Sequence, residues 1–217
     1  MANKKLNTWG YKLFRPILGP IFRLYYNPKI INKEAIPKDG TILIVGNHKH
    51  IMDQCSVIIS TKRLIHYMAK KEYFDGKTAW FFKATGCIPV DRSIHDENAK
   101  SSALEVLKSG GAIGLFPEGT RNKTSDKLLL DFKFGTVSMA SKTDATIVPY
   151  AITGDYKFRS KNLMIRFGKP FKIGNMSLES ANEKLYKEIE SLMKKNLKES
   201  NRTLEEELSS RCQDTKK

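Results

Sequence analysis

Short apolar runs alternate with amphipathic segments along most of this chain. Runs rich in Ile, Val and Leu have the length of buried strands at 41–45, 64–68, 88–90, 112–116, 146–152 and 163–167. Between them, the pattern predicts helices over 52–59, 78–84, 96–109 and 132–141. After Ser177, a favoured N-cap residue, apolar side chains recur at helical spacing up to Met193 and predict a long helix. This alternation predicts an α/β fold with a mixed, largely parallel sheet flanked by helices.

Two details refine this prediction. Pro89 cannot donate a ladder hydrogen bond, so its strand is expected at the edge of the sheet or at a strand end. The chain beyond Asn201 is highly charged, and we expect it to be a frayed helix or disordered.

The first 40 residues follow a different pattern. Between Trp9 and Tyr26, aromatic and aliphatic side chains are interleaved with Lys and Arg, which is typical of an amphipathic segment that lies on a membrane. A helix packed on the protein's own core is the alternative. Pro16 and Pro20 predict that any helix here breaks or kinks into one or two short pieces. We therefore divide the chain into a membrane-docking segment (1–40), an α/β domain (41–174) and a C-terminal helix with a charged tail (175–217).

The charge balance limits the partners. Among 217 residues there are 38 Lys and Arg against 23 Asp and Glu, a formal net charge of +15. Such a chain attracts nucleic acid, anionic lipid headgroups, an acidic protein or a phosphorylated substrate. The sequence contains no recognised nucleic-acid-binding motif, and its aromatic residues gather in the first 40 positions rather than along a basic sheet. We expect no nucleic-acid partner.

The cysteines and the apolar stretches indicate the compartment. Cys55, Cys87 and Cys212 are far apart, which gives neither a disulfide framework nor a metal-binding spacing, so a reducing cytosol is expected. The apolar stretch 16–22 is much shorter than the roughly 20 residues of a membrane span and lacks a signal cleavage site. No base adjoins Cys55 or Cys87 in the sequence, so neither is expected to be a nucleophile.

The loop Gly46-Asn-His-Lys-His-Ile-Met-Asp53 follows a predicted buried strand, where α/β sheets usually hold active sites. His48 and Asp53 can meet only if the histidine lies in the turn and the aspartate in the first helical turn. A carboxylate that holds one ring nitrogen's proton would make the imidazole a general base. The alternative is an ordinary loop histidine beside an aspartate that interacts with the helix dipole.

Two other predicted strands end in arginine. Gly86-Cys-Ile-Pro-Val-Asp-Arg92 and Phe116-Pro-Glu-Gly-Thr-Arg121 each place a guanidinium beside a turn, which suits a phosphate group. Gly119 would let the backbone approach a ligand closely. Alternatively, Glu118 and Arg121 pair across a turn, and Arg92 is solvated surface.

In this order and at these spacings, the three motifs resemble those of the glycerolipid acyltransferase family with its His-x4-Asp motif, and within it the 1-acylglycerol-3-phosphate (lysophosphatidic acid) acyltransferases. Asn47 precedes His48 as in the family, and 116–121 is a complete Phe-Pro-Glu-Gly-Thr-Arg. The segments Phe132-Lys-Phe-Gly135 and Ile147-Val-Pro-Tyr150 resemble the family's later blocks. The resemblance extends over residues 35–170 and implies the glycerolipid acyltransferase fold.

The resemblance also implies a reaction. A fatty acyl group passes from an acyl thioester, acyl-CoA or acyl carrier protein, to the sn-2 hydroxyl of 1-acylglycerol-3-phosphate and gives phosphatidic acid in phospholipid biosynthesis. His48 would be the general base, oriented by Asp53, and the attack would be direct, without an acyl-enzyme. Neither a cofactor beyond this co-substrate nor a metal is expected.

The remaining assignments also come from the resemblance. Arg92 and Arg121, with Lys133 as a weaker addition, would hold the acceptor's phosphate, and Glu118, Gly119 and Thr120 would complete the substrate-binding site. The enzyme is expected to be peripheral (monotopic), at an anionic membrane surface on the cytoplasmic face of the cell membrane.

One position departs from the family pattern. His50 stands where the family commonly has serine, a better helix cap, which makes His50 a second possible base and leaves the acceptor open. Alternative acceptors are glycerol-3-phosphate, another lysophospholipid or an aminolipid. A catalytically idle membrane-remodelling protein is a further alternative, against which the presence of both His48 and Asp53 counts.

Overall fold

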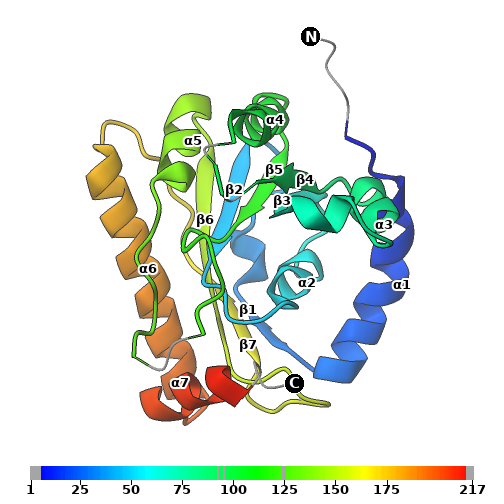
Figure 1. The fold of residues 1–217 in the computed structure, drawn as a ribbon. Coiled ribbons are helices and arrows are strands. Elements are labelled where there is room, and N and C mark those ends of the chain that lie inside the picture. The colour runs from blue at the N-terminus through cyan, green and yellow to red at the C-terminus, as the bar shows by residue number, and fades with distance from the viewer. Residues whose placement is uncertain (1–5, 92, 95, 124–125, 214–217) are drawn as a thin grey trace.

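A computed structural model describes residues 6–91, 93–94, 96–123 and 126–213. Its central element is a seven-stranded sheet with the strand order β1-β7-β6-β2-β5-β3-β4 (Figure 1). The strands are β1 (Lys29–Ile31), β2 (Ile42–Gly46), β3 (Ile65–Lys70), β4 (Ile88–Val90), β5 (Ala112–Leu115), β6 (Thr146–Thr153) and β7 (Met164–Phe167). Neighbouring strands pair in parallel except β6 and β7, which are antiparallel. The predicted α/β fold with a mixed, largely parallel sheet is confirmed.

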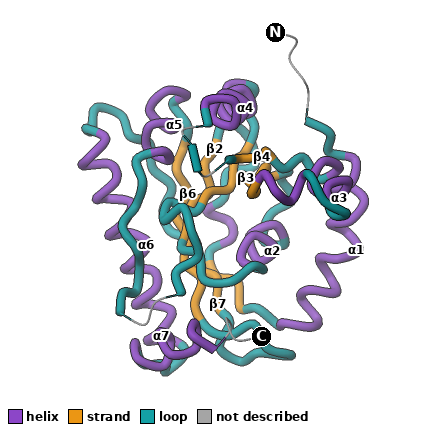
Figure 2. Tube along the Cα trace, in the orientation of Figure 1, coloured by secondary structure: helices purple, strands orange, loops and turns teal. Residues whose placement is uncertain are grey.

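Helices cover both faces of the sheet (Figure 2). They are α1 (Trp9–Tyr26), α2 (Asp53–Ile58), α3 (Ala79–Ala84), α4 (Glu97–Lys108), α5 (Gly135–Thr143), α6 (Leu178–Glu199) and α7 (Leu204–Gln213). Short 3₁₀ turns lie at Lys33–Ala35 and Lys71–Phe74. Ser177 caps α6 as predicted, since its side chain accepts a hydrogen bond from the Ser180 amide.

The core has two layers because successive strand residues point to opposite faces of the sheet. Leu43 and Val45 of β2 pack with residues of α4, α5 and α6. Ile42 and Ile44 pack on the other face with Val57 of α2. The central strand β2 is therefore fully buried, and it leads directly into the loop at its carboxyl end.

Strand β4 forms one edge of the sheet, as Pro89 predicts. The other edge is β1, which the sequence pattern did not predict. It has only three residues, Lys-Ile-Ile, and pairs with β7. Residues 29–31 thus belong to the sheet.

The prediction of short helical pieces at the N-terminus is wrong, because α1 is one helix of 18 residues that contains both Pro16 and Pro20. The two prolines are four residues apart and so lie on the same side of the helix. The hydrogen bonds that they remove are therefore on one side, and the ladder on the opposite side continues.

Beyond Asn201 the predicted helix is present, but within the described residues it is ordered and packed rather than frayed. Residues 204–213 form α7, whose side chains Glu207, Leu208 and Arg211 are buried. A charged segment can be ordered in this way when its charges are paired inside the protein.

Candidate active site

The candidate site lies at the carboxyl end of β2, where the loop 47–52 leads into α2. Asn47 fixes the start of this loop to β6 by two hydrogen bonds of 2.8 Å. Its side-chain nitrogen donates to the carbonyl of Ile152, and its side-chain oxygen accepts from the amide of the same residue. Because Asn47 is buried and both ends of its amide are paired, the loop starts from a fixed point.

The histidine and the aspartate of the motif are in contact. His48 lies in the loop, and Asp53 is the first residue of α2, which is the turn that the sequence requires. His48 Nδ1 lies 2.9 Å from Asp53 Oδ2. With Nδ1–H directed at the carboxylate, Nε2 is the ring nitrogen that can accept a proton. The pair has the geometry of a general base held in one tautomer.

Asp53 is fully buried and accepts hydrogen bonds from both sides. The backbone amides of Lys49 and His50 donate to Oδ2 at 2.7 and 2.8 Å, alongside the His48 ring. The hydroxyl of Tyr156, just beyond β6, donates to Oδ1 at 2.9 Å. The Asp53 carboxylate therefore orders the backbone of the turn through these two amides and orients the imidazole ring of His48.

The Phe-Pro-Glu-Gly-Thr-Arg segment after β5 packs directly on this turn. The ring of Phe116 stacks on the His48 ring, with centroids 3.9 Å apart. Glu118 accepts hydrogen bonds from the amide of His48 at 2.8 Å and from the amide of Leu130 at 2.9 Å. Burial raises the pKa of Glu118 to about 7, although these two amides act in the opposite direction.

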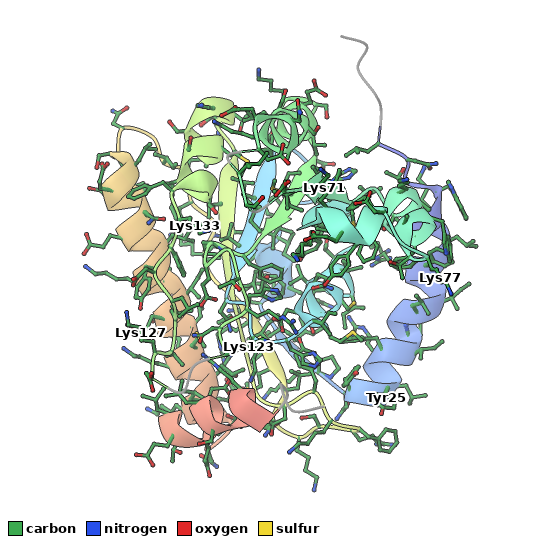
Figure 3. All side chains as sticks on the ribbon, viewed as in Figure 1. Tyr25, Lys71, Lys77, Lys123, Lys127 and Lys133 are labelled. Carbon is green, nitrogen blue, oxygen red and sulfur yellow. The ribbon has the colours of Figure 1, made fainter. Side chains whose placement is uncertain are left out.

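The predicted acceptor-binding residues follow on the same segment. Gly119 has a φ of +71°, a conformation that favours glycine, and the Lys133 side chain lies over it, with Cε 2.9 Å from where a Cβ atom would be. Thr120, Arg121 and Lys133 are exposed. Figure 3 shows Lys133 and Lys123 on the viewed face, on the segment between β5 and α5. The Asn122 amide donates to the His48 carbonyl at 2.7 Å, which joins the two motifs.

The structure thus brings His48, Asp53 and Glu118 into one hydrogen-bonded unit, with Gly119 and Lys133 beside it. Both oxygens of Glu118 are bonded to the backbone, a role that the sequence motif does not indicate. Arg92, predicted to hold phosphate, lies outside the described residues. The substrate roles of Gly119, Thr120, Arg121 and Lys133 stay predictions.

His50 lies in the loop that precedes α2 and contacts its neighbours there. Its Nδ1 accepts a hydrogen bond from the amide of Met52 at 3.1 Å, and its ring stacks on Tyr156 with centroids 4.4 Å apart. This bond lies within the loop, and no side chain caps the start of α2, as expected for an imidazole in place of serine. The Nδ1 that would face a carboxylate in a base accepts the Met52 amide instead.

Two residues near Asp53 were missed by the sequence analysis. The half-buried Tyr156 bonds to Asp53, and the buried Lys49 lies in the turn itself, but no recognisable motif spacing marks either residue. Tyr156 could have been suspected only from its position just after the buried strand β6, because the carboxyl end of β6 lies at the same edge of the sheet as the motifs.

The cysteines next to the motifs are unsuited to nucleophilic attack. Burial raises the pKa of Cys55 to about 11, and burial also raises the pKa of Cys87. Among the described residues, no three His, Cys, Asp or Glu side chains lie close enough together to hold a metal ion. Within the same ranges, no helix is both long and apolar enough to cross a membrane.

The sheet is mostly parallel, and the His48–Asp53 pair lies at the carboxyl end of its central strand, where α/β enzymes hold their active sites. Residues 27–153 match the family model described as Acyltransferase. A 1-acyl-sn-glycerol-3-phosphate acyltransferase of Bacillus subtilis is 31% identical over 190 residues, which cover 84% of this chain and 92% of that protein. The chain therefore belongs to the acyltransferase family and is an enzyme.

Two further proteins extend the comparison. A 1-acyl-sn-glycerol-3-phosphate acyltransferase of Borreliella burgdorferi is 32% identical over 149 residues, which cover 64% of this chain and 56% of that protein. The crystal structure of the 1-acyl-sn-glycerophosphate (LPA) acyltransferase PlsC from Thermotoga maritima superposes with a TM-score of 0.65 at 21% identity. The match covers 85% of this chain and 82% of that one, and it shows a shared fold.

Proposed function

We propose that this enzyme transfers a fatty acyl group from an acyl thioester to the sn-2 hydroxyl of 1-acylglycerol-3-phosphate and so makes phosphatidic acid for phospholipid synthesis. The single observation that carries the proposal is the 2.9 Å contact between His48 Nδ1 and the buried carboxylate of Asp53. The relatives whose names contain this reaction support the choice of acceptor. The donor is acyl-CoA or acyl carrier protein.

The mechanism follows from the tautomer. Nε2 of His48 accepts the proton of the acceptor's hydroxyl as the oxygen attacks the carbonyl carbon of the thioester. A carbon–oxygen bond forms, the carbon–sulfur bond breaks, and the imidazolium returns its proton to the thiolate that leaves. Asp53 stabilises the positive imidazolium between these two transfers. No covalent acyl-enzyme is needed.

The acceptor's phosphate lies, in this proposal, against the exposed cations beside Gly119. Arg121 offers a guanidinium that can bind a phosphate through two oxygens, and Lys133 adds a second charge over the glycine turn. Glu118 contributes through the backbone of His48 and Leu130, because both of its oxygens are already bonded there.

The enzyme works, in this proposal, at an anionic membrane surface on the cytoplasmic side. The outer side of α1 exposes large apolar side chains, namely Trp9, Leu13, Ile17, Leu18, Ile21, Leu24 and Tyr25. Its inner side is fixed to the protein, since Arg15 and Arg23 donate to the carbonyls of Thr61 and Ile59 near the end of α2. An apolar helix face held rigidly in this way suits insertion at the headgroup boundary.

An acyl-transfer assay tests the proposal. Purified protein on vesicles is given lysophosphatidic acid, glycerol-3-phosphate, lysophosphatidylcholine or a lyso-aminolipid, each with oleoyl-CoA and with oleoyl acyl carrier protein. We expect phosphatidic acid from lysophosphatidic acid and little product from the others. Transfer to another acceptor alone would replace the proposed substrate, and no transfer from either donor would contradict the proposed activity.

A further inference from the structure

Lys49 contacts the proposed His48–Asp53 pair through its backbone, but its side chain points away from this pair. Its amide donates to Asp53 Oδ2 at 2.7 Å, next to the His48 ring. Its ammonium group is buried and donates to the carbonyl of Gly154 and to Glu207 Oε1, each at 2.6 Å. A lysine between the two motif histidines thus connects the catalytic turn to helix α7.

Glu207 is the partner that compensates this buried charge. It is fully buried, and its second oxygen, Oε2, accepts from the amide of Gly154 at 2.8 Å. Two guanidinium groups complete its surroundings, those of Arg202 at 3.2 Å and Arg211 at 3.7 Å. A buried charge is tolerated only where it is paired and hydrogen-bonded, so Lys49 and Glu207 depend on each other.

The carboxylate of Glu207 therefore holds two segments at once. One is the turn with Lys49, which donates to Asp53 from one side. The other begins at Gly154 and carries Tyr156, whose hydroxyl donates to Asp53 from the opposite side. Gly154 has a φ of +87°, and a Cβ atom there would lie 1.9 Å from the carbonyl oxygen of Asn162, so only glycine fits at this point.

Helix α7 is itself anchored near the site. Arg211 Nη1 donates to the carbonyl of Leu128 at 3.1 Å, on the segment that follows the Phe-Pro-Glu-Gly-Thr-Arg motif. Arg202 donates to Asp155 Oδ1 at 3.0 Å. Figure 1 shows α7 in red beneath the sheet, next to the lower end of α6.

We infer that Glu207 is a positioning residue for the general base: by holding Lys49 and Gly154, it fixes both sets of hydrogen-bond donors around Asp53. This inference rests on the proposed function for its kinetic consequence, but its structural consequence can be measured without turnover. Neither Lys49 nor Glu207 contacts the reacting atoms, so both act through the backbone.

The test compares Glu207→Gln with Glu205→Gln, which removes the same charge from an exposed position of the same helix. The carboxylate of Glu207 accepts from the Lys49 ammonium group with one oxygen and from the Gly154 amide with the other. A glutamine has one such oxygen and turns an NH₂ group toward the second donor. Two quantities are measured in the full chain. The first is kcat and KM with lysophosphatidic acid, and the second is the proton resonance of His48 Nδ1–H in the hydrogen bond to Asp53.

We expect Glu207→Gln to lower kcat between about 10- and 100-fold with KM changed less than about twofold, because a small displacement of a catalytic group has effects of this size. We also expect the Nδ1–H resonance to shift or broaden, whereas Glu205→Gln leaves both quantities unchanged. A folded Glu207→Gln protein with wild-type kcat and an unmoved resonance would overturn the inference.

A second variant covers the case in which Glu207→Gln does not fold. Lys49→Met removes the link between the turn and Glu207, while the carboxylate of Glu207 keeps the guanidinium groups of Arg202 and Arg211 as partners. We expect it to fold and to show the same two changes, and an unaltered resonance in this variant would contradict the positioning role. If the wild type itself transfers no acyl group, the proposed function fails, while the resonance still tests Glu207.

Discussion

The hydroxyl of Tyr156 and the carboxylate of Asp53 form a 2.9 Å hydrogen bond across a sequence separation of 103 residues. Ser56, one turn after Asp53 in α2, makes a 2.9 Å hydrogen bond to the same hydroxyl. The aspartate of the motif is therefore oriented by a segment after β6 as well as by its own turn. The geometry of the proposed base therefore depends on tertiary contacts as well as on the motif.

Replacement of Tyr156 by phenylalanine should lower kcat. The variant keeps the ring that stacks on His50 and removes one hydrogen bond to a buried carboxylate, which is worth about 1.5–3 kcal/mol. We expect kcat to fall about tenfold or more, with KM for both substrates nearly unchanged. The matched control is Tyr186→Phe, whose ring packs on Phe132, and equal effects of the two variants would refute the orienting role.

Much of the fold and half of this site can be predicted from the sequence. The strands and helices around β2 show clear local patterns, and His48, Asp53 and Glu118 lie in motifs only a few residues long. Tyr156 and Glu207 could not be predicted because their contacts join distant segments. Glu207 in particular lies in a charged stretch, and only the tertiary structure shows that Lys49, Arg202 and Arg211 surround its buried carboxylate.

Local features account for the other differences. Strand β1 is too short to produce a periodic signal, and its pairing with β7 depends on the antiparallel return of β7 beside β6. His50 was expected to cap α2 less well than serine, and no side chain caps this helix; its Nδ1 accepts the Met52 amide within the loop instead. That contact depends on a rotamer that the sequence does not specify.

Glu118 should make the protein less stable as the pH rises. Its pKa is about 7 in the folded protein against an ordinary value of 4.5, so the folded state binds more protons than the unfolded state between these two values. Each pKa unit corresponds to about 1.4 kcal/mol. The contribution of Glu118 to the free energy of unfolding therefore falls by about 3 kcal/mol as the pH rises from 4.5 to about 7.

Urea unfolding of the wild type and of Glu118→Gln at pH 5 and pH 7.5 measures this effect. Because glutamine does not titrate, the stability advantage of the wild type over the variant should shrink between the two pH values. An advantage that stays constant or grows would show that the folded-state pKa is not raised.

Substitution of Arg121 or Lys133 by glutamine should weaken acceptor binding. If these cations hold a phosphate, each variant should raise KM for lysophosphatidic acid about tenfold, the size of one charge-assisted hydrogen bond, with a smaller effect on kcat. Lys127→Gln on the same segment is the control, because that ammonium group pairs with Asp131 at 3.7 Å. An unchanged KM in Arg121→Gln would place the phosphate elsewhere.

Introduction of a charge on the exposed face of α1 should release the enzyme from membranes. Leu24 is 73% exposed, so Leu24→Glu should leave the fold intact while it lowers binding to anionic vesicles about tenfold or more in a sedimentation assay. Leu204→Glu is the matched control, an exposed leucine of α7 given the same charge. Equal sedimentation of the Leu24 variant and the wild type would contradict docking through α1.

The most direct test of the account compares the two histidines of the turn. In the vesicle assay with lysophosphatidic acid, His48→Ala should lower kcat about 1000-fold, the range of a lost general base. His50→Ala removes one hydrogen bond within the loop and a ring contact and should remain within about tenfold of the wild type. Circular dichroism spectra of both variants are compared with that of the wild type to check that they are folded. Activity that survives in His48→Ala and is lost in His50→Ala would contradict the assignment of His48 as the base.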